Sequence, residues 1–404
     1  MSGTASPACP FELQLAKENG PSFGRPCQST YHPFVGLIFQ ERLEAIGYFG
    51  GEATFSPPCA DRVFFLDTGF VILRGMFKPI RQRGLSMLET HIEELVREDH
   101  PYRKLLSIVD FKRLCKPLRE LFCESRGRKG YHIESGFAAL VLQWMENLSD
   151  RELERFLQEN NAGKLFCGFS LLEKTPDHSY FSLLRKKIGT KRLAKLFNKF
   201  NAQLKKQGFV SEVFSFVDAS QIISKLSLWD ERDKAIEQGL EKFNNETAKK
   251  VANDPQARIG CKGKEKFWYG YKRNVSVCMK LGFITKVAVT PANIPDGRAL
   301  RNICPKESMV FADKGYCGKE SSKIMLQNGC VSKAILKNNM KGKDFKRDGK
   351  ISKLRMPFES VFSKQCKRAR YKGIAKNQFQ AFMQALAHNF KRLVVVRDTL
   401  LQEV

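Results

Sequence analysis

The spacing of apolar residues changes at Gly208, and this change constrains the fold more than any other feature. Before it, apolar residues recur at helical spacing, as in "SMLETHIEELVRE", where Leu88, Ile92 and Leu95 fall on one face. After it, short apolar runs of β type alternate with helical patterns. We therefore expect an all-helical part over about 87–208, followed by a part that contains a sheet.

The helical part carries recognisable start and stop signals. Ser149 with Glu152 forms a capping box that begins a helix after a break at Asn147. Thr175 is the expected N-cap of a later helix, with Pro176 at its first position. We interpret 87–208 as an all-helical, DNA-binding domain.

Three cations, Arg185, Lys186 and Lys187, lie near the end of one of these helices. Positive charge suits a helix C-terminus and is compatible with DNA binding. The alternative is that these residues form the ordinary charged outer face of a helical bundle. Both interpretations stay open at this point.

The part from 209 to 404 predicts an α/β fold with a mixed sheet. "SEVFSFVDAS" indicates a strand that ends at Asp218, and "NVSVCMKLGFITKVAVTPAN" indicates two strands joined near Gly282. "SMVFAD" and "VSKAIL" are further short strands, and helical patterns lie between them and at the C-terminal end. A polar segment at about 225–270 is the expected insertion.

Residues 1–86 have a different composition. They are rich in Pro, Gly, Ser and Cys and show no sustained periodicity. We interpret them as a poorly defined N-terminal extension, and Met87 as a possible natural start of translation. Peptides from before Met87 in the native product would contradict that start.

The formal net charge of +27 favours a polyanionic partner. Between Lys333 and Lys376 there are 15 Lys or Arg residues and three acids. Such a block indicates either an anion-binding surface or a solvated face. The weaker alternative for the whole chain is a merely basic protein without such a partner.

The 12 cysteines contain no C-x-x-C pair and no cluster with zinc spacing. Five of them lie among apolar neighbours and are typical of small core residues: Cys115, Cys123, Cys167, Cys278 and Cys330. A reducing cytoplasm is the simplest interpretation. The apolar run "VFFLDTGFVIL" is short and is interrupted by Asp67, so it predicts neither a membrane span nor a secretion signal.

Three acids stand out by position. Asp218 and Asp313 follow strands, and Glu359 lies in the helical pattern "RMPFESVFSK". Gathered in one crevice, three carboxylates would oppose each other's ionisation unless a cation were bound. Oxygen ligands suit Mg²⁺ or Mn²⁺, and two such ions could promote phosphodiester cleavage.

Each acid also has an ordinary structural explanation. Asp218 and Asp313 could be turn or capping residues. Glu359 could be a solvent-facing helix residue paired with Arg355. The three acids together point to chemistry more specifically than any one alone.

Five segments in this order carry a resemblance: "FVDASQI", "GYKRNVSV", "TPANIPDGRAL", "VFADKGYCG" and "RMPFESVFSK". They resemble the motifs of bacterial insertion-sequence transposases of the DDE type, in the insertion-sequence-5-like group. The segments "LSDRELERFL" and "FCGFSLLEKTPDHSYFSLLRKKIG" resemble the helical domain that precedes the catalytic domain in these enzymes, so the similarity covers about 87–395. The resemblance implies a ribonuclease H-like fold, Mg²⁺ or Mn²⁺ as two-ion cofactor, and movement of the element's own ends.

The resemblance assigns the catalytic and metal-binding triad to Asp218, Asp313 and Glu359, with Arg355 as the arginine four residues before the glutamate. The chain departs from the family where Ser352 replaces a tyrosine and Cys366 a basic residue. The expected contacts with DNA are Arg355, Lys314, Tyr316, Lys364, Lys367, Arg185, Lys186 and Lys187. Of the lysines near position 366, Lys367 is the expected phosphate contact, because on a continued helix it would lie nearer the Glu359 face.

The sequence therefore predicts a transposase that binds the terminal inverted repeats of its insertion sequence and cleaves and joins DNA. Its expected partners are DNA and further copies of itself, with no membrane and no small-molecule substrate. Its expected location is the bacterial cytoplasm, associated with the nucleoid. The alternatives are a catalytically inactive transposase-derived DNA-binding protein or regulator, and a general nuclease of the same fold.

Overall fold

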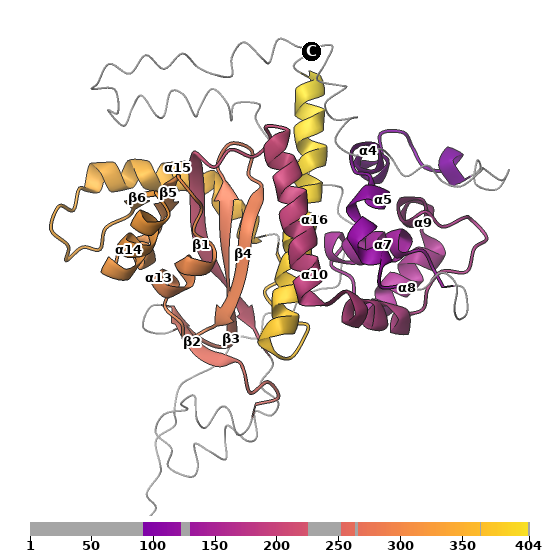
Figure 1. Cartoon of the computed structure of the whole chain (residues 1–404), viewed down its shortest axis with the longest axis horizontal. Helices are drawn as coiled ribbons and strands as arrows, with labels where there is room; N and C mark the ends of the chain where they lie inside the picture. The colour runs from indigo at the N-terminus through magenta and orange to yellow at the C-terminus, as the bar shows by residue number, and fades with distance from the viewer. Residues whose placement is uncertain (1–91, 123–129, 225–251, 263–265, 364, 403–404) are drawn as a thin grey trace, which may run out of the picture.

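The computed structural model describes residues 92–122, 130–224, 252–262, 266–363 and 365–402 (Figure 1). The predicted extension 1–86 and most of the predicted insertion lie outside these ranges. Within the described residues, no helix combines the length and the apolar character needed to cross a membrane.

The first part of the described chain consists of helices, as predicted. They are α4 Pro101–Ile108, α5 Phe111–Leu114, α6 Lys116–Arg119, α7 Ile133–Met145, α8 Asp150–Glu159 and α9 Asn161–Cys167. The capping box at Ser149 and Glu152 is confirmed, with both of its hydrogen bonds present. The break before it is also confirmed, because Asn147 has φ 58°.

Helix α10, His178–Lys206, begins two residues later than predicted. Its N-cap is Asp177, whose carboxylate accepts hydrogen bonds from the backbone N–H groups of Ser179 and Tyr180. The prediction of Thr175 was wrong because Asp177 can accept from two N–H groups that have no partner within the helix. Gly189, at φ 65° and ψ 163°, divides α10 into two helices.

The second part contains a mixed six-stranded sheet. Its strands are β1 Phe214–Ile223, β2 Arg258–Lys262, β3 Lys266–Cys278, β4 Ile284–Pro291, β5 Met309–Ala312 and β6 Val331–Ala334. The order is β2-β3-β1-β5-β6, and β4 also pairs with β3. β1 pairs antiparallel with β3 and parallel with β5, and β5 pairs parallel with β6.

Two sequence predictions about this sheet were wrong in extent. β1 continues past Asp218 to Ile223, because β3 pairs with it over that whole length. The end of the predicted insertion forms β2 and the start of β3 instead of a polar loop. In both cases the strand is extended by backbone pairing with a partner distant in sequence, which local residue patterns do not reveal.

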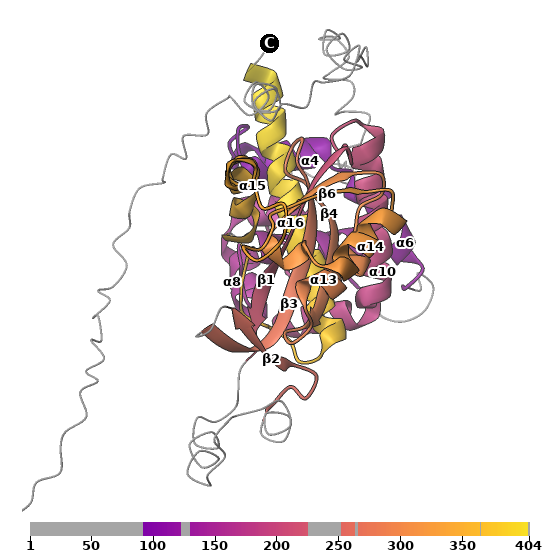
Figure 2. The same cartoon turned by 90° about the vertical axis from the view of Figure 1, so that its left-hand side faces the viewer.

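Short helices and two long ones complete the second part. They are α13 Asp296–Ala299, η1 Leu300–Asn302, η2 Lys314–Tyr316, α14 Lys319–Gln327, α15 Phe345–Ser363 and α16 Ile374–Gln402. One core lies on the face of the sheet that packs against α15 and α16, and a smaller core lies against α13, η2 and α14. Figure 2 shows α13 and α14 from their own side of the sheet.

Helices α10 and α16 lie between strand β4 and the helices α4 to α9 (Figure 1). The rings of Phe200 and Phe111 both pack on Phe390 of α16. Asn201 donates a hydrogen bond to the carbonyl oxygen of Thr285 in β4. The helical part and the sheet therefore share one continuous apolar core.

Candidate active site

The parallel pairing of β1 with β5 brings Asp218 and Asp313 together. The last paired residues are Val217 and Ala312, and each aspartate is the residue that follows this pair in the chain. Phe216 and Phe311 belong to the core beneath α15, and alternation along a strand directs both aspartates to that same face. The register of the strands thus juxtaposes two carboxylates 95 positions apart in the sequence.

Each aspartate also caps its own backbone. An oxygen of Asp218 accepts from the N–H of Ala219 at 2.8 Å, and an oxygen of Asp313 accepts from the N–H of Lys314 at 2.7 Å. Asp313 is the N-cap of η2. The capping explanation is therefore correct for Asp313 and does not exclude a second role, since these bonds fix the carboxylates in place.

Glu359 approaches from α15, and Arg355 lies one turn before it on the same helix. Nη2 of Arg355 lies 3.8 Å from an oxygen of Asp218 and 3.7 Å from one of Glu359, and Nη1 lies 3.6 Å from an oxygen of Asp313. The three predicted acids therefore surround one arginine, and the pairing of Arg355 with Glu359 is only one part of that arrangement.

Arg355 is a buried arginine. Its side chain is 6% exposed, and the guanidinium carbon lies 5.3 Å from the centre of the Phe216 ring. Its Nε has no hydrogen-bond partner among the described residues. Three carboxylates share this single guanidinium, so the ionised site holds two negative charges in excess.

The pKa of Asp218 reflects this imbalance. The pKa of Asp218 is raised to about 6, with burial as the largest cause and smaller contributions from the charges of Asp313 and Asp296, while the Ala219 N–H and Arg355 oppose the increase. Asp218 therefore lies in a site that favours either a proton or an additional cation.

Two family comparisons match most of the described chain. Residues 90–187 match the family described as "Transposase domain (DUF772)", and residues 246–390 match "Transposase DDE domain". Together they cover more than half of the 404 residues. The chain belongs to the insertion-sequence transposases of the DDE type. No curated protein and no solved structure gave a match.

The match to the "Transposase DDE domain" family begins at residue 246, so it includes Asp313 and Glu359 but not Asp218. The assignment of Asp218 therefore depends on the strand register and on the contact with Arg355. The insertion-sequence-5-like subgroup stays a prediction.

The carboxylates of Asp218, Asp313 and Glu359 in this transposase are chemically suited to bind a divalent cation. Carboxylate oxygens are the ligands that Mg²⁺ and Mn²⁺ prefer, and the excess of two negative charges equals the charge of one such ion. In the described part of the chain, no three His, Cys, Asp or Glu side chains are gathered closely enough to hold a metal ion. The three acids instead each form an ion pair with Arg355.

The expected DNA contacts in the helical part differ in exposure. Arg185 is 11% exposed and forms two hydrogen bonds with the carboxylate of Asp150, so it stabilises the helical part and is not available to DNA. Its expected role was wrong because Asp150 lies 35 residues away and only the tertiary structure pairs them. Lys186 and Lys187 are exposed, and the Lys187 ammonium lies over the ring of Phe122.

The two residues expected to contact DNA near Asp313 also differ in exposure. Lys314 is exposed next to Asp313, whereas Tyr316 is 1% exposed and cannot contact DNA in this structure. The prediction for Tyr316 was wrong because its ring packs in the core against α14.

Of the two lysines near position 366, only Lys367 belongs to the described residues. Lys364 lies outside the described residues. Lys367 is exposed, but α15 ends at Ser363, so the argument that placed Lys367 on the Glu359 face of a helix was wrong. The chain leaves the helix to bond with the end of β1, where the N–H of Ile223 donates to the carbonyl of Lys367.

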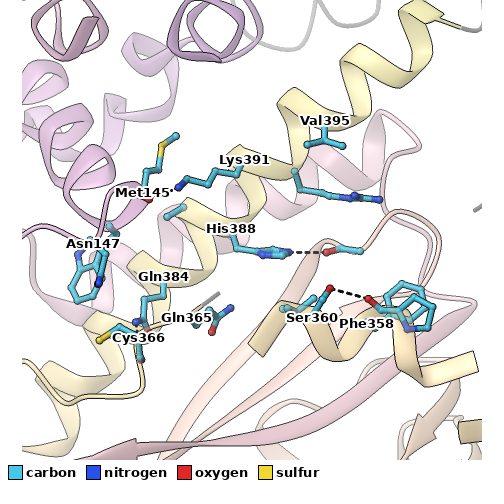
Figure 3. A pocket seen from close by; sticks show the side chains of 16 residues that line it. Met145, Asn147, Phe358, Ser360, Gln365, Cys366, Gln384, His388, Lys391 and Val395 are labelled. Atoms are coloured by element: carbon cyan, nitrogen blue, oxygen red, sulfur yellow. Dashed lines mark hydrogen bonds between the residues drawn. The ribbon is translucent and has the colours of Figure 1, made fainter. Parts of the chain in front are cut away.

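A separate cavity of about 510 Å³ lies on the other side of α15, between that helix, α16 and the end of α7 (Figure 3). Phe358, Ser360 and Val361 line it from α15, and His388 lines it from α16. The amide of Gln365 is buried there without a hydrogen-bond partner in the described part of the chain. Because α15 lies between them, this cavity is distinct from the carboxylate site.

The sequence analysis missed one acid close to the site. Asp296 begins α13, and its charge contributes to the raised pKa of Asp218. The residue lies within "TPANIPDGRAL", five positions after Pro291, the last residue of β4. Asp218 and Asp313 were singled out because each ends a predicted strand, and Asp296 does not carry that signal.

Proposed function

We propose that this transposase binds the terminal inverted repeats of its insertion sequence and cleaves and joins DNA with the help of divalent metal ions. The observation that carries the proposal is the convergence of Asp218, Asp313 and Glu359 on the buried Arg355. The order of the strands, with antiparallel β3 beside a parallel β1-β5-β6 set, supports a ribonuclease H-like fold.

Asp218, Asp313 and Glu359 would hold the metal, Mg²⁺ or Mn²⁺ in one or two ions. When bound, such ions stabilise the charge that develops on the attacking and leaving oxygens of a phosphodiester. Before binding, Arg355 offsets part of the negative charge and keeps Asp313 and Glu359 oriented toward Asp218. It also brings a positive charge close to the place where a DNA phosphate would lie.

Exposed cations would attract the DNA backbone to this site. Lys314 follows Asp313 directly, and Lys367 lies on the segment that pairs with the end of β1. Lys186 and Lys187 supply exposed positive charge on the helical part. A second copy of the chain would be needed to bring two element ends together, so we include a homo-oligomer in the proposal.

Cleavage of DNA that carries the element's ends tests the proposal. Purified chain with Mg²⁺ or Mn²⁺ should break strands at the terminal repeats, and Glu359→Gln should lower the rate at least about 10²-fold while binding to the same DNA persists. Glu320→Gln is the matched control, because Glu320 is an exposed acid paired with surface arginines. Unchanged cleavage by Glu359→Gln would show that the site is wrong.

Two other outcomes would favour the alternatives. Equal cleavage of DNA that lacks the repeats would favour a general nuclease. Binding to the repeats without any metal-dependent strand breakage by the parent chain would favour an inactive DNA-binding protein or regulator.

A further inference from the structure

Asp296 and Lys272 form an ion pair next to the carboxylate site, on the opposite face of the sheet from α15. The Lys272 ammonium donates to a carboxylate oxygen of Asp296 at 2.9 Å and to the carbonyl oxygen of Ile294 at 3.1 Å. Lys272 lies on β3, opposite Gln221 of β1. The side chain of Lys272 is 14% exposed and that of Asp296 is 31% exposed, so the pair is half-buried and still reached by solvent.

The second oxygen of Asp296 lies against the turn that carries Asp313. A Cβ atom built on Gly315 would lie 3.3 Å from that oxygen. A Cβ built on Gly297, the next residue of α13, would lie 2.6 Å from the hydroxyl of Ser321 in α14. Gly315 therefore permits the start of α13 to pack closely on η2, two residues after Asp313, and Gly297 permits it to pack closely on α14.

Tyr316 gives an independent indication that a ligand belongs in this space. Its side chain is 1% exposed, and its hydroxyl has no hydrogen-bond partner among the described residues. Burial raises the pKa of Tyr316, and the charges of Asp296, Asp218 and Asp313 raise it further, in that order. A buried donor without an acceptor is costly, and three carboxylates act on this one electrostatically.

We propose that Asp296 is a fourth carboxylate of the active site, a positioning residue that favours divalent-cation binding. It supports the Asp313 turn through Gly315 and Tyr316, and it adds negative charge on the side of the site opposite Arg355. Lys272 holds Asp296 in place. This inference rests on the proposed binding of a divalent cation by Asp218, Asp313 and Glu359.

The test measures Mn²⁺ binding directly, by calorimetric titration of the full chain without DNA. Asp296→Asn keeps the shape of the side chain and removes its charge, and we expect Mn²⁺ affinity to fall about tenfold, since about 1.4 kcal/mol corresponds to that factor. Glu320→Gln, which removes an exposed acid on the neighbouring α14, should leave Mn²⁺ affinity unchanged. Unchanged affinity in Asp296→Asn would overturn the inference.

A second measurement separates positioning from loss of structure. With terminal-repeat DNA, Asp296→Asn should need about tenfold more Mn²⁺ for half-maximal cleavage, and saturating Mn²⁺ should restore most of the rate. Asp296→Glu, which keeps the charge, should restore part of the Mn²⁺ affinity. A lower rate at every Mn²⁺ concentration, with no shift of the midpoint, would show a merely structural role and contradict the inference.

Asp313→Asn distinguishes the failure of the inference from the failure of the proposed function. If Asp313→Asn abolishes Mn²⁺ binding and Asp296→Asn does not change it, only the inference is wrong. If Asp313→Asn binds Mn²⁺ as tightly as the parent chain, the proposed metal site itself is wrong, and the role of Asp296 falls with it.

Discussion

Arg355 is the residue on which the candidate site is built. It is buried between the core and three carboxylates, and it is the one guanidinium that contacts all three of them in the described chain. A buried arginine is costly to desolvate, and its charge is retained here because three acids compensate it. Its replacement therefore affects both stability and the charge of the site.

Arg355→Met should destabilise the chain at neutral pH by about 2 kcal/mol, because three carboxylates then lose their shared partner. Mn²⁺ should recover part of this loss, since a cation can replace the guanidinium charge. Chemical denaturation with and without Mn²⁺ measures both effects. Arg301→Met is the control, because Arg301 is exposed and lies 3.8 Å from Glu320, and it should cost less than about 0.5 kcal/mol.

The raised pKa of Asp218 makes stability depend on pH. A folded-state pKa of about 6, above the ordinary 3.8, means that the folded chain favours protonated Asp218. The stabilising effect of that proton is complete below about pH 4 and is lost as the pH rises through about 6.

Asp218→Asn should therefore be more stable than the parent chain above about pH 6, by on the order of 3 kcal/mol, and the difference should vanish below about pH 4. Denaturation in a chelator at several pH values measures it. The same difference at every pH would show that the charge of Asp218 is not the cause.

At the scale of elements, Gly189 decides the shape of α10. Its φ of 65° with ψ of 163° is a conformation that essentially only glycine adopts. It lets the first helix pack in the helical part, where Arg185 meets Asp150, and lets the second pack on α16, where Phe197 contacts Phe382. One residue thus connects two packing environments.

Gly189→Ala should lower the free energy of unfolding by about 1–3 kcal/mol, because a Cβ strains this backbone although the space around it is open. Gly349→Ala is the opposite control. Gly349 lies inside α15 with open space around it, and an alanine there should raise stability by about 0.5–1 kcal/mol. Equal effects in thermal unfolding would contradict the backbone argument.

At the scale of the whole molecule, the helical part and the sheet are joined by more than their shared core. The guanidinium of Arg370, on the segment after α15, lies 4.2 Å from the centre of the Trp144 ring. It also donates hydrogen bonds to the carbonyl of Leu148 and the side chain of Asn147. The segment that follows the Glu359 helix is thereby fixed to the α7–α8 connection.

The net charge of +27 also acts at this scale, and binding to DNA should depend strongly on salt. If the block from Lys333 to Lys376 makes on the order of 6–10 phosphate contacts, affinity should fall roughly 10³–10⁵-fold between about 50 and 200 mM salt. Titrations of labelled DNA at several salt concentrations measure the slope.

A triple variant locates the contacts. Replacement of Lys346, Lys353 and Lys367 by Gln should reduce the slope of log affinity against log salt by about 2–3. The same replacement of Lys306, Lys319 and Lys323, which are exposed and lie outside both the helical part and the 333–376 block, is the matched control and should leave the slope nearly unchanged. An unchanged slope in the first variant would remove the block from the DNA interface.

The amino-acid sequence by itself determined most element types and the identity of the acids. The capping box at Ser149, the hairpin turn at Gly282 and the strand before Asp313 are encoded by neighbouring residues, so periodicity and turn chemistry predict them. The motifs that contain Asp313 and Glu359 are likewise made of neighbouring residues.

Only the tertiary structure decided what these residues contact. The full length of β1, the burial of Tyr316 and the pairing of Arg185 with Asp150 all depend on partners distant in sequence. The central position of Arg355 and the approach of Asp296 from the other face of the sheet depend on them too. Burial and electrostatic environment arise from long-range packing, and local sequence patterns do not reveal which distant residues will pack against a given side chain.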